Sequence, residues 1–191
     1  VKQIVMSATY RQSSQVSAEK LKVEPDNILL SYGPRQRLTA EGVRDLVLAS
    51  SGLLVGEIGG PGVKVYQPKG IWESSTSGRG VLARYVQDHG NNLYRRGMYS
   101  FIKRTVPPPG MLVFDASNRD QCEVSRMTTN TPLQALVLLN EPLILEGARV
   151  FAERLMAQAG NPQAKIETAF QAIVCRKPKA EEVSQLMSYY E

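Results

Sequence analysis

The residues with the greatest capacity for chemistry lie in one run, LYRRGMYSFIKRTVPPPGMLVFDASNRDQCEVSRMTTNTPLQALVLLNEPLIL, from Leu93 to Leu145. Its cationic groups can bind phosphate, sulfate or carboxylate, and its tyrosine rings can stack on bases or sugars. These cations and rings are Tyr94, Arg95, Arg96, Tyr99, Lys103 and Arg104. The competing interpretation is an ordinary surface helix whose arginines pair with nearby carboxylates of the same chain.

Three carboxylates in the same run offer a second kind of chemistry. Asp115, Asp120 and Glu123 cluster in the sequence, and glycoside hydrolysis uses a pair of such groups as acid and base. The favoured interpretation is that they pair with Arg119, Arg126 or Arg104 and cap neighbouring turns. Asn130 and Asn140 flank an apolar segment, where their side chains are expected to satisfy terminal backbone groups.

No motif predicts a metal, a cofactor or a catalytic residue. The chain has one histidine and no CxxC, CxxCH or HExxH pattern. GEIGGPGVKVY is glycine-rich, but Pro61 interrupts it and a short edge strand from Val63 to Tyr66 is a better interpretation than a phosphate loop. For Cys122 and Cys175, two buried thiols are favoured over one disulfide.

Composition sets the frame for these candidates. The 191 residues carry a formal charge of +5, with 42% hydrophobic and 21% charged residues. This composition is typical of a globular domain, and the charge favours anionic partners without choosing among them. No apolar run approaches the roughly 20 residues needed to cross a bilayer. We expect residues 1–38 to be an arm, cut from a larger domain, and residues 39–191 to be one mainly helical domain.

The first part of that domain must position the cations. Thr39 and Gly52 predict the two ends of a helix with Val43, Leu46 and Val47 as its buried stripe. The cations themselves are placed on a helix over 93–104. Three further segments are expected to be extended: a short strand at 81–86, polyproline II at 107–109, and a strand or extended segment at 111–114.

Four helices are predicted towards the end of the chain. Thr131-Pro132 begins the most apolar one, PLQALVLLN, which is expected to be central in the core. Pro142 and Asn161-Pro162 begin the next two, and the last carries Val183, Leu186, Met187 and Tyr190. Short turns should make these helices antiparallel neighbours. The predicted fold is therefore mainly α, a helical bundle-like domain with long irregular loops and a few short β-strands.

The central run also resembles a known family. The pattern YRRxxYxFxKRxxPPPxMxxFDAxNRxxCxxxRxxTNTPLQALxLLN is similar to the planctomycete-specific domain one (PSD-one) family, a domain of unknown function. The resemblance extends to RLTAEGVRDLVLASSGLL and to AFQAIVCRKPKAEEVSQLMSYYE, and departs at Lys179 and Glu141, where Thr and Asp are common. The motif positions carried over are Tyr94, Arg95, Arg96, Lys103, Arg104, Asp115, Arg119, Arg126, Asn130 and Asn140.

The resemblance implies a setting but no activity. Such domains end large exported planctomycete proteins, often after a cytochrome-c-like domain, so any haem would belong to a neighbouring domain. The leading hypothesis is a non-catalytic binding domain of an exported or envelope-associated protein. Its basic, aromatic surface would hold an anionic polysaccharide or a partner domain, including neighbouring domains of the same polypeptide. The alternatives are part of a polysaccharide-degrading enzyme and a nucleic-acid-binding module; nucleic acid fits an exported setting poorly.

Overall fold

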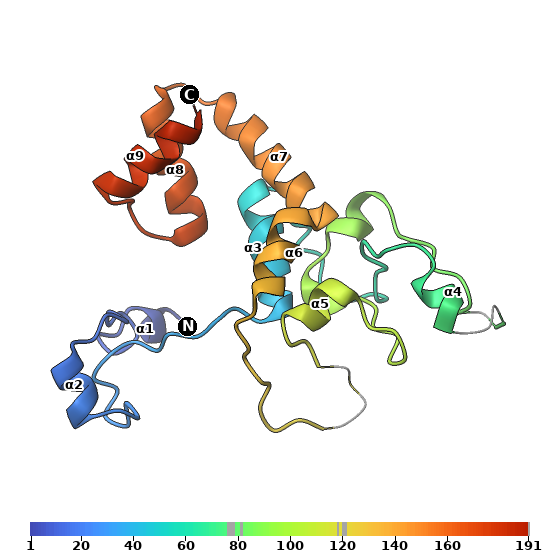
Figure 1. The fold of residues 1–191 in the computed structure, drawn as a ribbon, viewed down its shortest axis with the longest axis horizontal. Helices are drawn as coiled ribbons and strands as arrows, with labels where there is room; N and C mark the ends of the chain where they lie inside the picture. Colours follow the sequence, from blue (N-terminus) through green and yellow to red (C-terminus); the bar gives the residue numbers. More distant parts are fainter. Residues whose placement is uncertain (76–78, 81, 118, 120–121, 191) are drawn as a thin grey trace. The chain divides into compact units, whose positions relative to one another are not determined.

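The computed structural model describes most of the chain, which divides into two compact units at residues 1–37 and 38–191. The described residues are 1–75, 79–80, 82–117, 119 and 122–190. The helices are α1 (Lys2–Val5), α2 (Ala18–Val23), α3 (Ala40–Ser51), α4 (Ile71–Ser75), η1 (Gly90–Tyr94), η2 (Gly97–Tyr99), α5 (Pro109–Val113), α6 (Pro132–Asn140), α7 (Pro142–Met156), α8 (Pro162–Val174) and α9 (Ala180–Tyr190) (Figure 1).

The prediction of a mainly α fold is confirmed. Among the described residues, β-structure is limited to isolated bridges that pair Val55 with Arg95, Val63 with Ser100, and Lys103 with Val106. The expected alternation at 63–66 holds, because Val63 and Val65 are buried while their neighbours are partly exposed. The expected edge strand does not form there: the segment has only the isolated bridge of Val63. No strand forms at 82–86, and Val81 lies outside the described residues.

The smaller unit is held together by short-range hydrogen bonds. The Ser17 hydroxyl caps α2 by accepting from the backbone N–H of Lys20. The Tyr32 hydroxyl donates to the carbonyls of Glu24 and Pro25, at 3.2 and 3.0 Å, which closes the turn after α2. Neither α1 nor α2 buries a residue, so this unit has little apolar core of its own.

The larger unit is organised around α3. The Thr39 side chain accepts from the N–H of Gly42, and Gly52 ends the helix at φ +83, so both predicted ends are confirmed. The buried stripe is not the predicted one: Ala40, Arg44, Leu48 and Ser51 are buried, whereas Val43, Leu46 and Val47 are only partly covered. The apolar spacing predicted the position of the helix correctly but the wrong buried face, because the buried face contains the charged residue Arg44.

Close backbone approach fixes α3 between two neighbours. A Cβ on Gly147 of α7 would lie 2.6 Å from Val47, and one on Gly97 of η2 would lie 2.7 Å from the Cα of Glu41. Only glycine fits at either contact. Beside α3, Ala40, Met111 and Phe114 form an apolar cluster with Val137 packed against it.

Two predicted elements are wrong in the central run. The expected helix over 93–104 is replaced by η1 and η2, two single 3₁₀ turns separated by extended residues. The expected strand at 111–114 is instead the end of the short helix α5 and its C-cap, Phe114. Pro109 begins α5, so the polyproline II predicted at 107–109 is wrong for Pro109, while Pro108 is extended. Both differences arise where tertiary contacts, described below, determine the backbone more strongly than local propensity does.

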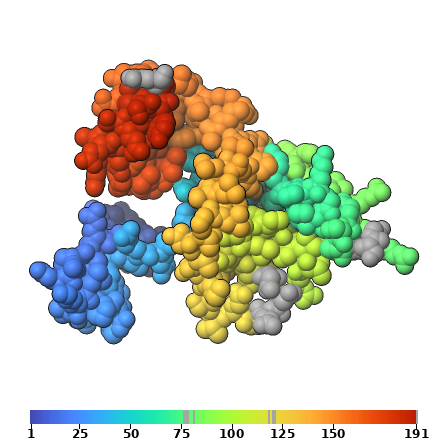
Figure 2. Space-filling model, in the orientation of Figure 1, coloured from blue at the N-terminus to red at the C-terminus, as the bar shows by residue number. Residues whose placement is uncertain are grey.

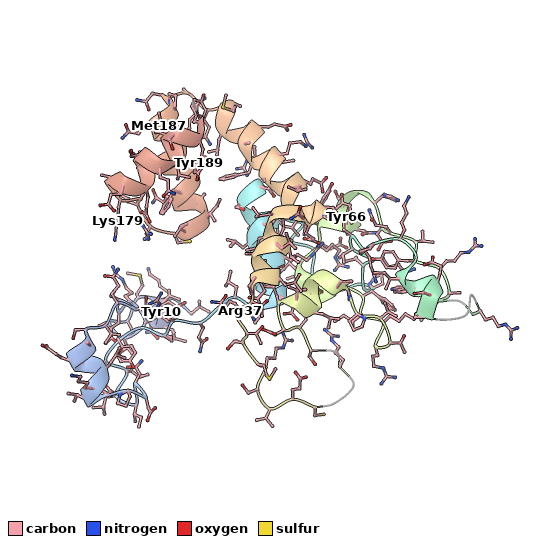
Figure 3. All side chains as sticks on the ribbon, viewed as in Figure 1. Tyr10, Arg37, Tyr66, Lys179, Met187 and Tyr189 are labelled. Carbon is pink, nitrogen blue, oxygen red and sulfur yellow. The ribbon has the colours of Figure 1, made fainter. Side chains whose placement is uncertain are left out.

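The last four helices form where they were predicted, and each contacts the next in sequence. Packing against α3 falls mainly to α7, and neither α8 nor α9 buries a residue. Figure 3 places Lys179, Met187 and Tyr189 on the α8–α9 hairpin, whose apolar side chains are only partly covered. Cys175 ends α8 at φ +58 and, like Cys122, is a free and exposed thiol, so the prediction of buried thiols is wrong.

Candidate interaction surface

Arg95 lies inside the fold, at 2% exposure. Its guanidinium donates to the carbonyls of Pro61 (2.9 Å), Glu57 (3.4 Å) and Gly59, and lies 3.9 Å from the Tyr99 ring centroid. The Tyr99 hydroxyl in turn accepts from the N–H of Gly59 at 2.8 Å. These two side chains therefore organise the glycine-rich loop, which explains both the loop's conformation and the break in the expected helix.

Lys103 is also used internally. Its ammonium donates to the carbonyl of Leu82 (3.2 Å) and the hydroxyl of Ser75 (3.4 Å), and lies 4.7 Å from the ring centroid of Trp72. Trp72 is 1% exposed, so this cation lies over the buried ring of a core residue. A charge placed there is compensated by the ring and by oxygen acceptors of the same chain.

Arg44 is a third buried cation, and the sequence analysis did not single it out. Its guanidinium donates to the carbonyls of Leu93 (2.6 Å) and Arg95 (3.2 and 3.3 Å), and burial lowers its pKa. The available signal was its spacing, because Arg44 follows Ala40 and precedes Leu48 by one helical turn each. Arg44 joins α3 to the first half of the motif.

Two motif arginines make surface ion pairs, with partners other than the predicted ones. Arg96 donates to Asp45 at 2.9 Å, and Asp45 also accepts from the N–H of Gly97 at 2.6 Å. Arg126 donates to Glu41 at 2.7 Å, which lowers the pKa of Glu41 against the opposing effect of burial. Both pairs tie the motif to α3.

The remaining polar candidates do not join these cations in one site. Arg104, Arg119 and Asn130 are exposed, and no side-chain hydrogen bond of theirs is present in the part of the chain that the structure describes. Asn140 donates from Nδ2 to the carbonyl of Leu136 at 2.8 Å, at the end of α6. The motif's cations are thus divided among buried positions, ion pairs and separate exposed positions.

Asp115 closes the loop that precedes α6. Its carboxylate accepts from the N–H of Thr129 (2.8 Å) and from the Thr129 hydroxyl (2.9 Å). The amide of Gln134 donates to the carbonyl of Val113 (2.9 Å) and to Thr129, so the base of the loop is fixed to α5 and α6. Glu123 is exposed, and Asp120 lies outside the described residues.

Two tyrosines share one carboxylate of α7. The hydroxyls of Tyr66 and Tyr94 donate to Glu146 at 2.9 and 2.8 Å. Burial, followed by this hydrogen bond, raises the pKa of Tyr66 to about 12; the hydrogen bond is the largest cause of the raised pKa of Tyr94. The anchored Tyr66 ring has a fixed orientation, and it forms one wall of the groove described next.

The most apolar helix of the chain lies at the surface, so the prediction that it is central in the core is wrong. Leu133, Leu136 and Leu139 are 53%, 56% and 71% exposed, and the buried residue of α6 is the polar Gln134. Figure 2 shows this segment, in light orange, on the outside of the larger unit. We call Leu133, Leu136 and Leu139 the leucine face of α6.

An open groove of about 690 Å³ runs beside the leucine face. It is lined by Tyr66, Gln67, Pro68, Pro109, Gly110, Val113, Leu133, Leu136, Val137, Asn140, Glu141 and Pro142. These residues come from α6, α5, the start of α7 and the segment after the Val63 bridge. Most of the lining is apolar, which suits an apolar ligand or partner.

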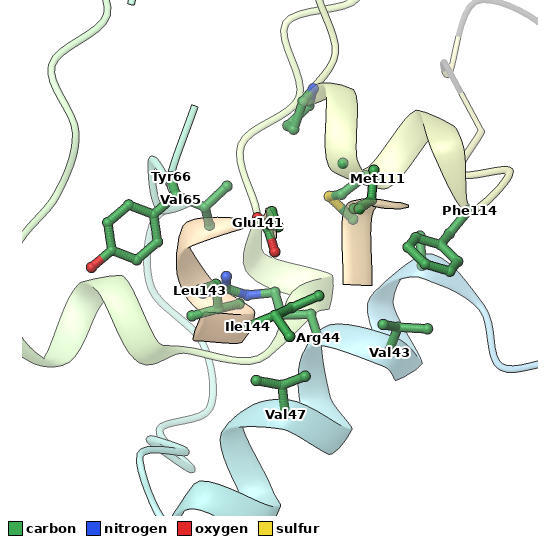
Figure 4. Close-up of a pocket in the computed structure, with 14 residues that line it drawn as sticks. Val43, Arg44, Val47, Val65, Tyr66, Met111, Phe114, Glu141, Leu143 and Ile144 are labelled. Carbon is green, nitrogen blue, oxygen red and sulfur yellow. The ribbon is translucent and has the colours of Figure 1, made fainter. Parts of the chain in front are cut away.

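Glu141 is the carboxylate of this groove. It also lines a smaller cavity of about 40 Å³ on its inner side, together with Arg44, and Figure 4 shows both side chains directed into that cavity. Burial raises the pKa of Glu141, while the positive charge of Arg44 opposes the rise. Within the described residues the carboxylate accepts no hydrogen bond, so its capacity for a cation or donor is unused.

Two other kinds of feature are absent from the described part of the chain. Among the described residues, no group of three or more His, Cys, Asp or Glu side chains is arranged to hold a metal ion. No helix in the described part of the chain has the length and apolar character needed to cross a membrane.

These features define a mainly helical domain with two buried motif cations and an external apolar groove. The sequence profile of the PSD1 family, described as protein of unknown function (DUF1553), matches residues 1–190. The chain belongs to this family, which confirms the resemblance noted from the central motif. Comparisons with curated proteins and with solved structures gave no significant match.

Proposed function

We propose that this domain is a non-catalytic binding domain that holds another polypeptide on the leucine face of α6 and in the adjoining groove. The observation that carries the proposal is the exposure of the helix's leucines, which are 53 to 71% exposed. Each Å² of apolar area left in water lacks the roughly 25 cal/mol of stabilising free energy that burial would give. Contiguous exposed apolar surface of this kind is typical of protein interaction sites.

Of the two ligand classes expected from the sequence, a partner polypeptide has more support than an anionic polysaccharide. A polysaccharide site would need several cations on one open surface. Arg95 and Lys103 are instead directed at carbonyls and rings of their own chain, and Arg96 is paired with Asp45. The groove, in contrast, is lined by no lysine or arginine.

A peptide selection tests this function directly. The probe is a displayed library of helical peptides with leucines at positions i, i+3 and i+7, selected on the immobilised chain. We expect the wild type to enrich binders that fail to bind Leu136→Asp. Leu145→Asp is the matched control, because Leu145 is 53% exposed on α7 and does not line the groove.

Three outcomes would count against the proposal. One is the absence of any enriched peptide, and another is equal binding by Leu136→Asp. The third is binding to a sulfated-glycan array that weakens with salt and persists in Leu136→Asp, which would return the function to the polysaccharide. Circular dichroism of each variant shows whether it is folded.

We also propose that the binding takes place in an exported or envelope-associated protein, as the family resemblance implied. Fractionation of cells that express the full protein with a carboxyl-terminal tag tests this setting. A tag found only in the cytoplasmic fraction would contradict it, and would leave the proposed binding surface unaffected.

A further inference from the structure

The groove beside the leucine face is chemically uneven. Its lining is mostly apolar, with Leu133 and Leu136 from α6 and Pro109 and Val113 from α5. Among the lining residues, the one carboxylate is that of Glu141, and the Tyr66 hydroxyl is already bonded to Glu146. An occupant therefore meets a mostly apolar surface that contains one carboxylate.

The charge of Glu141 is not satisfied from the inner side. Arg44 lies across the small cavity, but its guanidinium is directed by hydrogen bonds to the carbonyls of Leu93 and Arg95. No ion pair joins Glu141 and Arg44 within the described residues, although Arg44 is the main charge that Glu141 experiences. A half-buried carboxylate without a hydrogen bond is stabilised strongly when a donor arrives in a dry site.

The shape of the site favours a helical occupant. No paired strand borders the groove in the described residues, so an extended peptide would find no edge with which to continue a sheet. Proline-rich ligands bind between several aromatic rings, and Tyr66 is the one aromatic side chain in the lining. A helix can instead lay leucine-type side chains beside α6 in the ordinary manner of helix packing.

We infer that the groove binds a helix of a partner polypeptide that carries apolar side chains along one face and a single lysine or arginine that pairs with Glu141. The inference rests on the proposed function and adds the chemistry of the partner. The long aliphatic stem of lysine or arginine suits the apolar walls, while its charged end reaches the carboxylate. Apolar contact supplies affinity, and the ion pair supplies register and specificity.

The selected peptides provide the first measurement. In the pool enriched on the wild-type chain, lysine or arginine should predominate at one helical position between the fixed leucines. The same library selected on Glu141→Gln should lose that preference and keep the leucines. Glu181→Gln is the matched control: Glu181 is exposed on α9, outside the groove, and should leave the preference unchanged.

A double-mutant cycle with the best peptide gives the second measurement. Replacing its conserved lysine by methionine should weaken binding to the wild type by about tenfold and binding to Glu141→Gln by less than about twofold. Glu141→Gln keeps the side-chain volume, and no hydrogen bond of the carboxylate is lost within the described residues. Loss of binding should therefore not reflect unfolding.

The outcomes separate this inference from the function on which it rests. If leucine-rich peptides bind in a Leu136-dependent way without any preference for a cation, the pairing with Glu141 is wrong and the proposed function stands. If no peptide binds, both fail. Dimerisation of the chain abolished by Leu136→Asp, or binding to phosphatidylcholine vesicles abolished by it, would replace the partner helix by a second copy or a lipid surface and overturn the inference.

Discussion

Two cations of the segment from Tyr94 to Arg104 are buried, whereas the leucines of the apolar helix α6 are exposed, which is the reverse of what their compositions predict. Arg95 is 2% exposed and Lys103 is 9% exposed, whereas Leu136 is 56% exposed. The difference shows that the type of a side chain indicates which contacts it can make. It does not indicate whether those contacts lie inside the same fold or in another molecule. Arg95 and Lys103 contact carbonyls and rings of their own chain, while the leucines of α6 are exposed.

The largest expected effect comes from Arg95. Replacing Arg95 by alanine leaves carbonyls of the 57–61 loop without their donor and removes the contact with Tyr99, so we expect a loss of about 3 kcal/mol in the free energy of unfolding. Chemical denaturation measures it. Arg104→Ala, at an exposed position of the same segment, should change stability by less than about 0.5 kcal/mol. Equal losses of stability in Arg95→Ala and Arg104→Ala would contradict the distinction between the buried and the exposed cation.

The leucines should show the reverse pattern. Leu143 at the start of α7 is 2% exposed, so Leu143→Ala should destabilise the fold by about 3 kcal/mol. Leu136→Ala on the leucine face should alter stability by less than about 0.5 kcal/mol while weakening the binding of a selected peptide. Thermal unfolding monitored by circular dichroism compares the two variants. A large destabilisation by Leu136→Ala would show that α6 belongs to the core.

Glu141, which lines both the inner cavity and the open groove, gives a pH-dependent test of its burial. Burial raises its pKa in the folded state, so the stability linked to it is present below its ordinary pKa of 4.5 and is lost as pH rises through the raised value. Glu141→Gln removes this linkage. The urea midpoint of the variant, relative to that of the wild type, should therefore increase from pH 4.5 to pH 7. A difference that is constant with pH would contradict the burial of the carboxylate.

The smallest effect is expected for the exposed ion pair of the cationic segment. Arg96 and Asp45 have side chains that are 52% and 22% exposed. Arg96→Ala should lower the free energy of unfolding by about 0.5 kcal/mol, and added salt should reduce the difference. A loss of stability comparable to that of Arg95→Ala would contradict the structure, in which Arg95 is buried and Arg96 is exposed.

Local signals were sufficient to locate most helices. Thr39 and Asn161 cap α3 and α8 as predicted, and Thr131 forms a capping box with Gln134 at the start of α6. Each signal acts within one turn of the chain, so the sequence contains everything needed to interpret it. The αL residue Gly52 is a further case of the same kind.

The candidate site depended on longer-range contacts that no local pattern contains. The 93–104 segment has helical spacing, but the bonds from Arg95 to a loop more than 30 residues away outweigh that propensity. The glycine at position 97 was the signal in the sequence against a helix there, and in the structure Gly97 approaches α3 too closely for any Cβ. For α6 the apolar composition predicted burial in the core, which is wrong, because composition does not specify which face of the fold a helix occupies.

Hydrogen exchange of the wild-type chain, with and without a selected peptide, shows whether the peptide binds beside α6. We expect new protection in α5, α6 and the start of α7, between residues 109 and 145, with the 94–104 segment unchanged. Protection confined to the segment that carries Arg96 and Arg104, with α6 exchanging as before, would contradict it.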